Sequence, residues 1–93
     1  MVEQINQMLA SKAQGNPFGA TVKFVANEGV FYVDGTNGSV SNEDKEAQCT
    51  IFVSSEDLQA MLSGELNPTT AFMSGKMRIE GDMSVAMKLQ SIF

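Results

Sequence analysis

Few residues of this 93-residue chain are suited to catalysis or metal binding. The chain has no histidine and a single cysteine, Cys49. Histidine is the commonest general base and metal ligand in proteins, so a Cys–His nucleophile pair and an ordinary zinc site are excluded. Ser74-Gly75-Lys76 lacks the preceding glycine and the spacing of a phosphate-binding loop. We therefore expect neither a metal nor a cofactor.

Three pairs of acidic residues remain as candidates for acid–base catalysis. They are Glu43 with Asp44, Glu56 with Asp57, and Glu80 with Asp82. Carboxylates do this work only when burial or a neighbouring charge tunes their pKa. Each pair has a plainer interpretation: the first lies in a polar loop, the second in the first turn of a helix, and the third between a strand and a helix. We therefore expect a protein that is not an enzyme.

The composition limits the class of partner. The formal net charge is −5 and the six basic residues are scattered, which argues against nucleic acid because phosphate binding needs clustered lysine and arginine. The same charge disfavours a standing attraction to anionic membranes, although a transient membrane contact stays compatible with it. An apolar content of 43% and this length are typical of one globular domain over residues 1–93.

We identify no targeting signal at either end of this sequence. Glu3 and Gln4 interrupt the apolar stretch that a secretory signal would need, and Ser91-Ile92-Phe93 is not a peroxisomal signal. No apolar run is long enough to span a bilayer. A lone cysteine cannot form an intrachain disulfide, which fits a reducing compartment. We expect a cytoplasmic protein.

The spacing of apolar residues in the first half predicts one helix followed by strands. Ile5, Met8 and Leu9 lie three and four residues apart, as on one helix face, and the Gly15-Asn16-Pro17 segment ends that helix. Alternation over 21–26 and 30–33, with a turn between them, predicts a hairpin.

Two further strands are expected at 39–41 and 47–53. The odd-numbered residues of the longer strand, Ala47 to Val53, share one face that we expect to point inward. Phe52 then falls on the opposite face, where it is either covered or an isolated surface aromatic. Between these strands, 42–46 reads as an exposed polar loop.

The second half begins with helix signals. Ser54-Ser55-Glu56-Asp57 is a capping signature, and Gly64 is in the usual position after a helix end. Asn67 and Pro68 then start a short helix. From Ser74 to Glu80 the pattern has period two, with Gly75, Met77 and Ile79 on one face. This pattern requires a sheet that helices cover on one side.

The last helix, which follows Asp82 as N-cap, has an unusually wide apolar surface. Its apolar residues from Met83 to Phe93 spread over roughly 220° of the helix circumference. One sheet face cannot cover that arc, so another helix, a partner protein or a ligand must share it. Gln90 lies within the arc. It bonds a neighbouring polar group, lies in a frayed last turn, or contacts a ligand head group.

Five of the methionines fall in the last 33 residues of the chain. They are Met61, Met73, Met77, Met83 and Met87. Clustered methionine is ordinary core packing in most proteins, but its flexible side chain also suits a pocket that accommodates several apolar shapes. The wide apolar helix beside them favours a ligand pocket.

The second half of the chain resembles the sterol carrier protein-2 domain family. The similarity is carried by an ordered string of residues from Cys49 to Gln90. Its segments are Ser55-Glu56-Asp57-Leu58, Leu62-Ser63-Gly64-Glu65-Leu66-Asn67-Pro68, Ala71-Phe72-Met73-Ser74-Gly75-Lys76-Met77-Arg78-Ile79-Glu80-Gly81-Asp82-Met83 and Ala86-Met87-Lys88-Leu89-Gln90. In the first half, Val22-Lys23-Phe24, Tyr32-Val33-Asp34 and Gly38-Ser39-Val40 are similar to the first strands of the family.

The resemblance implies an α+β sandwich, in which helices cover one face of a five-stranded, mainly antiparallel sheet and enclose an apolar tunnel. It also implies non-catalytic binding and transfer of fatty acids, fatty acyl-CoA, phospholipids or sterols. The first helix is short here and the peroxisomal tail is absent, which favours a free-standing, prokaryotic-type member and weakens a sterol as the ligand.

We expect inward-facing side chains of the strands and helices to line the lipid-binding tunnel. The candidates are Phe31, Val33, Ile51, Met61, Leu62, Leu66, Phe72, Met77, Ile79, Met83, Met87 and Gln90. The alternative is a scaffold that binds another protein, or an accessory factor for a lipid or isoprenoid-quinone biosynthetic enzyme. In that case Ile92 and Phe93 are buried against a partner or in a homodimer, whereas a lipid carrier is compatible with a monomer.

Overall fold

The computed structural model describes residues 2–15 and 18–89 as four helices and five strands. Their order is α1 (Val2–Gly15), β1 (Thr21–Ala26), β2 (Gly29–Asp34), β3 (Ser39–Ser41), β4 (Cys49–Val53), α2 (Ser55–Ser63), α3 (Pro68–Met73), β5 (Met77–Gly81) and α4 (Met83–Leu89). Ile92 and Phe93 lie outside the described residues, as does Gln90.

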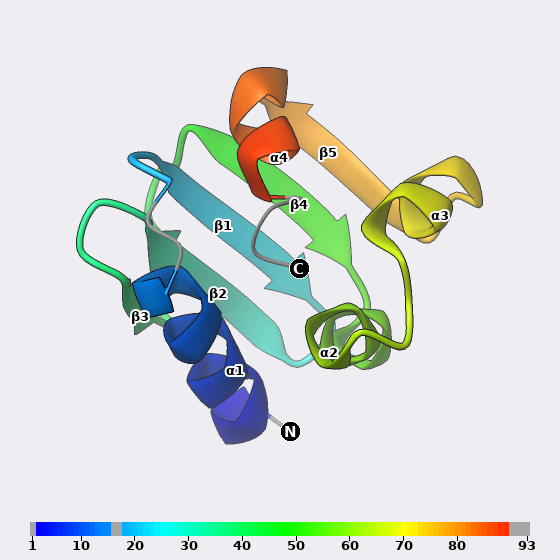
Figure 1. Ribbon diagram of the computed structural model, residues 1–93, viewed down its shortest axis with the longest axis horizontal. Coiled ribbons are helices and arrows are strands. Elements are labelled where there is room, and N and C mark those ends of the chain that lie inside the picture. The colour runs from blue at the N-terminus through cyan, green and yellow to red at the C-terminus, as the bar shows by residue number, and fades with distance from the viewer. Residues whose placement is uncertain (1, 16–17, 90–93) are drawn as a thin grey trace.

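The strands form a single sheet in the order β3-β2-β1-β4-β5 (Figure 1). β1 and β4 are parallel, and the three other neighbouring pairs are antiparallel. This confirms the predicted five-stranded, mainly antiparallel sheet. The hairpin of β1 and β2 also forms as expected, with Phe24 opposite Phe31.

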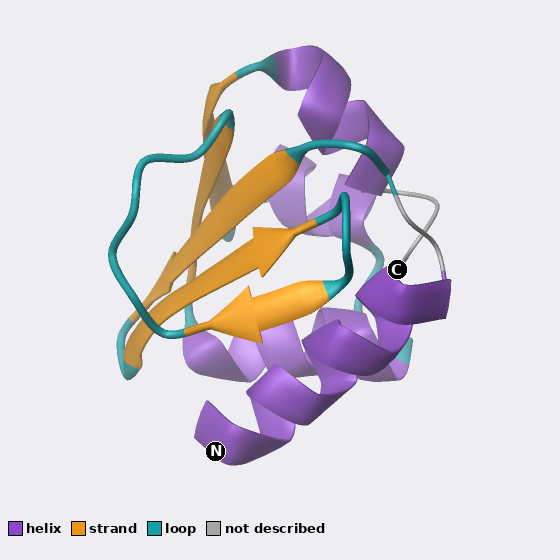
Figure 2. Ribbon diagram, turned by 90° about the vertical axis from the view of Figure 1, so that its left-hand side faces the viewer, coloured by secondary structure: helices purple, strands orange, loops and turns teal. Residues whose placement is uncertain are grey.

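All four helices cover the same face of the sheet, which Figure 2 shows edge-on. Side chains on that face are buried, Phe24, Phe31 and Ile51 among them. α1 packs on β2 and β3 through the buried residues Ile5 and Leu9, which lie four apart and therefore on one side of the helix. The core thus lies between one sheet face and one helical layer.

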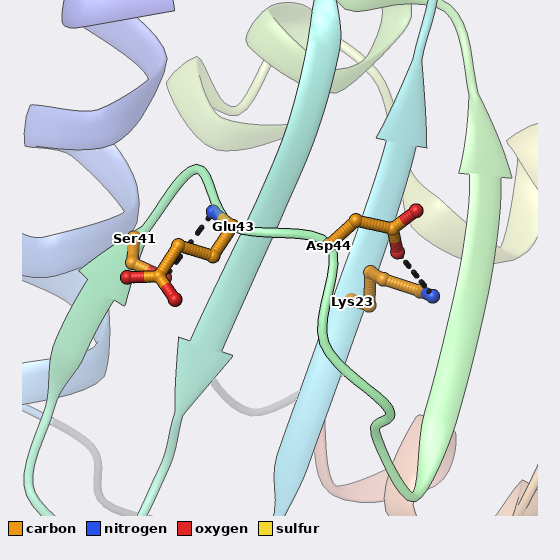
Figure 3. A network of polar contacts seen from close by, with 4 residues as sticks. All are labelled: Lys23, Ser41, Glu43 and Asp44. Atoms are coloured by element: carbon orange, nitrogen blue, oxygen red, sulfur yellow. Dashed lines mark hydrogen bonds and ion pairs between the residues drawn. The ribbon is translucent and has the colours of Figure 1, made fainter.

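The opposite face of the sheet is crossed by a strap, residues 42–48, that leads from β3 to β4. In Figure 3 this segment passes in front of β2 and β1. The Lys23 ammonium lies 2.8 Å from an Asp44 carboxylate oxygen, and the Asn42 side chain donates to the Val30 carbonyl at 2.9 Å. Lys45 lies 5.4 Å above the ring of Tyr32. The strap is therefore attached to the sheet by side chains.

The helix ends follow the predicted caps. The Ser54 hydroxyl accepts a hydrogen bond from the Asp57 amide, and Gly64 ends α2 with φ of 86°. The Asn67 side chain accepts from the amides of Thr69 and Thr70 at the start of α3. These caps pair the backbone amides that a helix leaves without partners at its first turn.

Two predicted strand starts were too early. β5 begins at Met77 instead of Ser74, because Gly75 turns with φ of 78° and the Lys76 amide donates to the Ala71 carbonyl. β4 begins at Cys49, so Ala47 lies outside the strand. Phe52 is 37% exposed, with the Arg78 guanidinium 5.9 Å from its ring, and is thus a surface aromatic.

Candidate apolar pocket between α3, α4 and the sheet

An apolar pocket of about 160 Å³ lies where α3 and α4 cover β4 and β5. α3 precedes β5 and α4 follows it, and Figure 1 shows the two helices in front of the sheet at opposite ends of this strand. The lining residues are Ile51, Pro68, Thr69, Phe72, Met77, Ile79, Met83, Ala86, Met87 and Leu89.

The floor of the pocket is formed by the inward face of the two strands. Ile51 of β4 is directly opposite Ile79 of β5, and Met77 lies two residues earlier on the same face. Ile51 and Met77 are buried, as is Leu89, which closes the floor from α4. The pocket floor is therefore part of the protein core.

The walls come from one side of each helix. In α3, Pro68 and Phe72 lie four residues apart, and in α4 Met83 and Met87 do so. This spacing places each pair on one helix face. Phe72, Met83 and Met87 are 47%, 50% and 68% exposed, so they form the rim through which the pocket opens to solvent.

The start of α4 is fixed by a short polar contact. One Asp82 carboxylate oxygen accepts hydrogen bonds from the Ser84 amide at 2.9 Å and from the Ser84 hydroxyl at 2.6 Å. These bonds stabilise the charged form and lower the pKa of Asp82 below its ordinary value. Asp82 therefore acts as the predicted N-cap of the helix that carries two of the three rim side chains, Met83 and Met87.

Cys49 lies on the inner face of β4 and is buried. Burial raises the pKa of its thiol, and the charge of Asp82 acts in the same direction. A thiol in this state is a poor nucleophile, so Cys49 packs as a small apolar residue. In the described part of the chain, no three cysteine or acidic side chains are grouped so that they could hold a metal ion.

Six of the twelve residues that the sequence nominated line this pocket. They are Ile51, Phe72, Met77, Ile79, Met83 and Met87. Phe31 and Val33 are buried on β2, which β1 separates from β4, so they belong to the other half of the core.

The nominated residues of the middle of the chain also lie away from this pocket. Met61 is buried, Leu66 packs against the core, and Leu62 lines a separate hollow next to α1. These positions follow from α2 packing against α1 instead of β5. Gln90 lies outside the described residues, so its proposed head-group contact stays a prediction.

Four lining residues were not nominated from the sequence. Ala86 and Leu89 belong to the apolar arc of the last helix, but only the methionines and Gln90 of that arc were nominated. Pro68 and Thr69 were assigned only to a helix start, although they lie four and three residues before Phe72 and thus on its side of the helix. Thr69 supplies the polar side chain of the described lining.

Two larger hollows lie beside α1 and α2, at about 290 and 270 Å³. They are shallow and open, and they are lined in part by Lys12, Glu56 and Glu65. Charged side chains make a poor environment for an apolar chain, so the smaller pocket is the better candidate site.

The described residues form a pocket with an exposed rim, and they do not show the expected tunnel. A volume of about 160 Å³ is also below the roughly 300–1,000 Å³ that is usual for small-molecule sites.

None of the helices in the described part of the chain is both long and apolar enough to cross a membrane.

A five-stranded sheet covered by helices on one face, with an apolar pocket at one end, defines a small α+β domain with a candidate ligand site. The model of the SCP-2 sterol transfer family matches residues 2–93, and the chain belongs to this family. The resemblance noted in the sequence is therefore confirmed.

Among its relatives, sterol carrier protein 2 of Bos taurus is 40% identical over 94 residues. That match covers 98% of this chain and 16% of the bovine protein, so the chain spans only a small part of the curated relatives it matches first.

Solved structures show the same fold at lower identity. The crystal structure of sterol carrier protein 2 like 2 from Aedes aegypti matches with a TM-score of 0.77 and 22% identity, over 99% of this chain and 95% of that one. The solution structure of sterol carrier protein-2 from Aedes aegypti in complex with the C16 fatty acid palmitate matches with a TM-score of 0.79 and 17% identity. That match covers 96% of this chain and 90% of the other.

Proposed function

We propose that this protein binds and transfers lipids without catalysis, and that the pocket between α3 and α4 receives the apolar chain. The observation that carries the proposal is the lining: nine of its ten side chains are apolar, with buried residues at the floor and flexible methionines at the rim. Membership of the SCP-2 sterol transfer family and the palmitate complex of a structural relative support it.

A fatty acid is the ligand class that this lining fits best. Each buried CH₂ contributes about 0.8 kcal/mol, whereas association costs about 4–15 kcal/mol in lost freedom. A measurable affinity therefore needs many methylenes, more than a pocket of about 160 Å³ holds. Binding requires the pocket to widen, and Met83 and Met87 are suited to this because unbranched thioether side chains repack at low cost.

The polar end of the ligand lies at the rim in this proposal. The Thr69 hydroxyl lies on the first turn of α3, where the lining reaches solvent. A carboxylate there keeps its hydration while the chain extends toward Ile51 and Leu89. We therefore assign to Thr69 a polar contact with the head group.

The test is saturable binding of a fluorescent fatty acid by delipidated protein. We expect the double variant Met83→Gln/Met87→Gln to lower the affinity about tenfold, because two amides then face the apolar chain at a cost of about 1–3 kcal/mol. Met73→Gln is the matched control. Met73 is 80% exposed and does not line the pocket, so its substitution should leave fatty-acid binding unchanged.

Absence of saturable binding by the unmodified protein would contradict the proposal. Equal losses in the pocket variant and in Met73→Gln would place the ligand elsewhere. Circular dichroism of each variant shows whether it is folded, and the exposure of all three methionines predicts that it is.

A further inference from the structure

The strand β5 lies at one edge of the sheet, and no strand in the described part of the chain lies beyond it (Figure 1). A free edge presents backbone amides and carbonyls that can pair with a strand of another chain. The opposite edge strand, β3, has three residues, whereas β5 has five. The edge of β5 therefore offers the longer ladder to a partner strand.

The hydrogen bonds between β4 and β5 show which backbone groups of β5 face outward. The Asp82 amide donates to the Gln48 carbonyl at 2.9 Å, directly after the last residue pair of the two strands. Because alternate residues of an antiparallel strand direct their backbone groups to the same neighbour, those of Arg78 and Glu80 also face β4. The backbone groups that point away from β4 belong to Met77, Ile79 and Gly81.

The side chains of this strand carry opposite charges two residues apart. Arg78 and Glu80 alternate with the pocket-lining Met77 and Ile79, so both charges lie on the sheet face that the helices leave uncovered. They form an ion pair with each other, and their side chains are 76% and 47% exposed. Both charged groups are therefore accessible to a further partner.

Two copies of β5 fit together in one antiparallel register, in which Ile79 of one copy is opposite Ile79 of the other. The outward backbone groups of Met77 then face those of Gly81 in the second copy, so each outward amide has a carbonyl opposite it. The same register sets Arg78 of each copy opposite Glu80 of the other, at the positions where side chains are closest. Sliding one strand by two residues would instead set two arginines or two glutamates directly opposite each other. The charges therefore favour this register.

We propose that β5 pairs with β5 of a second copy of this chain in this register, so that two sheets join into one. Charge complementarity identifies the occupant, because an identical strand brings an opposite charge to both Arg78 and Glu80. The pairing also sets the two Ile79 side chains next to each other on the helix-covered face, and Ile79 lines the pocket. The two pockets therefore lie side by side across the seam. This dimer goes beyond the proposed function and forms without lipid.

Charged residues on an edge strand have a second known use, which is to prevent pairing with other strands. A strand that lacks this charge pattern would leave Arg78 or Glu80 facing an apolar or like-charged side chain. The same two residues thus disfavour foreign strands while they accept a copy of their own strand. Protection of the edge alone predicts a monomer, and this is the outcome that the experiment separates from pairing.

Sedimentation equilibrium at protein concentrations up to about 1 mM measures the pairing through an exchange of charges. We expect the unmodified protein to dimerise. Arg78→Glu or Glu80→Arg alone should raise the dissociation constant at least tenfold, because four like charges then meet at the seam. An equimolar mixture of these two variants has opposite charges at every position again, and it should form a heterodimer about as stable as the unmodified dimer. Lys45→Glu makes the same change of charge on the strap above Tyr32 of β2, and it should leave the dissociation constant unchanged.

Hydrogen exchange of single backbone amides, followed by NMR, tests the register. The amides of Met77, Ile79 and Gly81 should exchange several-fold more slowly as the protein concentration rises, because only the dimer gives them partners. The amides of Arg78 and Glu80 bond β4 in either state, so their exchange should depend much less on concentration. A dimer that buries another surface would leave the three outward amides unprotected.

A monomer at every concentration overturns the proposal, as does a dimer without protection of the outward amides. Failure of the two folded charge variants to form a heterodimer also overturns it, and circular dichroism shows that each is folded. Neither Arg78 nor Glu80 lines the pocket, so fatty-acid binding by the variants reports on the proposed function separately. Dimers that bind no fatty acid would contradict the proposed function alone, and monomers that bind it would contradict only the pairing.

Discussion

The carboxylate of Asp82 makes the stability of α4 sensitive to acid. Hydrogen bonds from Ser84 lower the pKa of Asp82, so its stabilising effect is fully present above the ordinary aspartate value of about 4 and is lost as the pH falls through the lower folded value. We expect the thermal midpoint of the unmodified protein to fall more steeply below about pH 4 than that of Asp82→Asn.

Thermal unfolding followed by circular dichroism from pH 7 to pH 2 measures this difference. Asp34 has a lowered pKa for the same reason, through Thr36, and is present in both proteins. It therefore cancels in the comparison. Parallel pH curves for the two proteins would contradict the role of Asp82.

Six of the twelve nominated residues line the pocket, because side-chain chemistry and periodicity show which residues face inward. They do not show which part of the core a residue faces. Val33 and Ile51 are equivalent in their strand patterns, and only the order β3-β2-β1-β4-β5 separates them. That order depends on contacts between residues far apart in the chain. Thr69 was not predicted as a lining residue, because a polar residue at a helix start usually stabilises that helix end.

At the scale of the elements, Gly81 joins β5 to α4 in a conformation that other residues rarely adopt. Its φ is +100°, and a Cβ there would lie 2.6 Å from the Gln48 carbonyl oxygen. The next amide, of Asp82, donates to the same oxygen at 2.9 Å, so the backbone cannot move away freely. We expect Gly81→Ala to destabilise the protein by about 2 kcal/mol or more in urea unfolding.

Gly64 provides the control for this prediction. It also has a positive φ, but no atom lies within 4 Å of a Cβ built on it. Gly64→Ala should therefore show the conformational cost of about 1 kcal/mol alone. If the two variants were equally stable, the crowding against Gln48 would have no energetic role.

The strap, residues 42–48, is attached to the sheet more strongly by the Asn42 side-chain amide than by the Lys23–Asp44 ion pair. Asn42 donates to the Val30 carbonyl and exchanges side-chain hydrogen bonds with Asn6 of α1. The Lys23–Asp44 pair has an Asp44 carboxylate that is 73% exposed, and such pairs contribute little. We expect Asn42→Ala to cost about 1–2 kcal/mol and Asp44→Asn less than about 0.5 kcal/mol, measured by urea unfolding. The reverse order would contradict this.

The elements themselves were largely predictable because their boundary signals are local. Ser54, Gly64 and Asn67 cap their helices through contacts within a few residues. The start of β5 was missed because the Lys76 amide bonds back to Ala71, and its period-two pattern begins before the strand does. The path of residues 42–48 across the sheet depends on the distant partners Lys23 and Val30, which a polar loop sequence does not reveal.

At the scale of the whole molecule, the two halves of the helical layer differ in how completely they cover the sheet. α1 buries Ile5, Leu9 and Ala13 completely against β2, β3 and α2. α3 and α4 instead leave Phe72 and Met87 exposed, at 47% and 68%, around a pocket. The completely covered part of the sheet and the proposed ligand pocket thus lie at opposite ends of one sheet. Local opening should concentrate at the α3–α4 end, where less apolar surface is buried.

A ligand that binds only the folded α3–α4 end must stabilise that end against local opening, by an amount that grows with ligand concentration. Hydrogen–deuterium exchange with and without saturating fatty acid should therefore show slower exchange in α3, β5 and α4, with several-fold protection. Exchange in α1 and in the β1–β2 hairpin should be nearly unchanged. Protection centred on α1 and α2 would point instead to the hollows beside Met8. Uniform protection would mean that the sheet opens as one unit, and that the pocket end is not the less stable half.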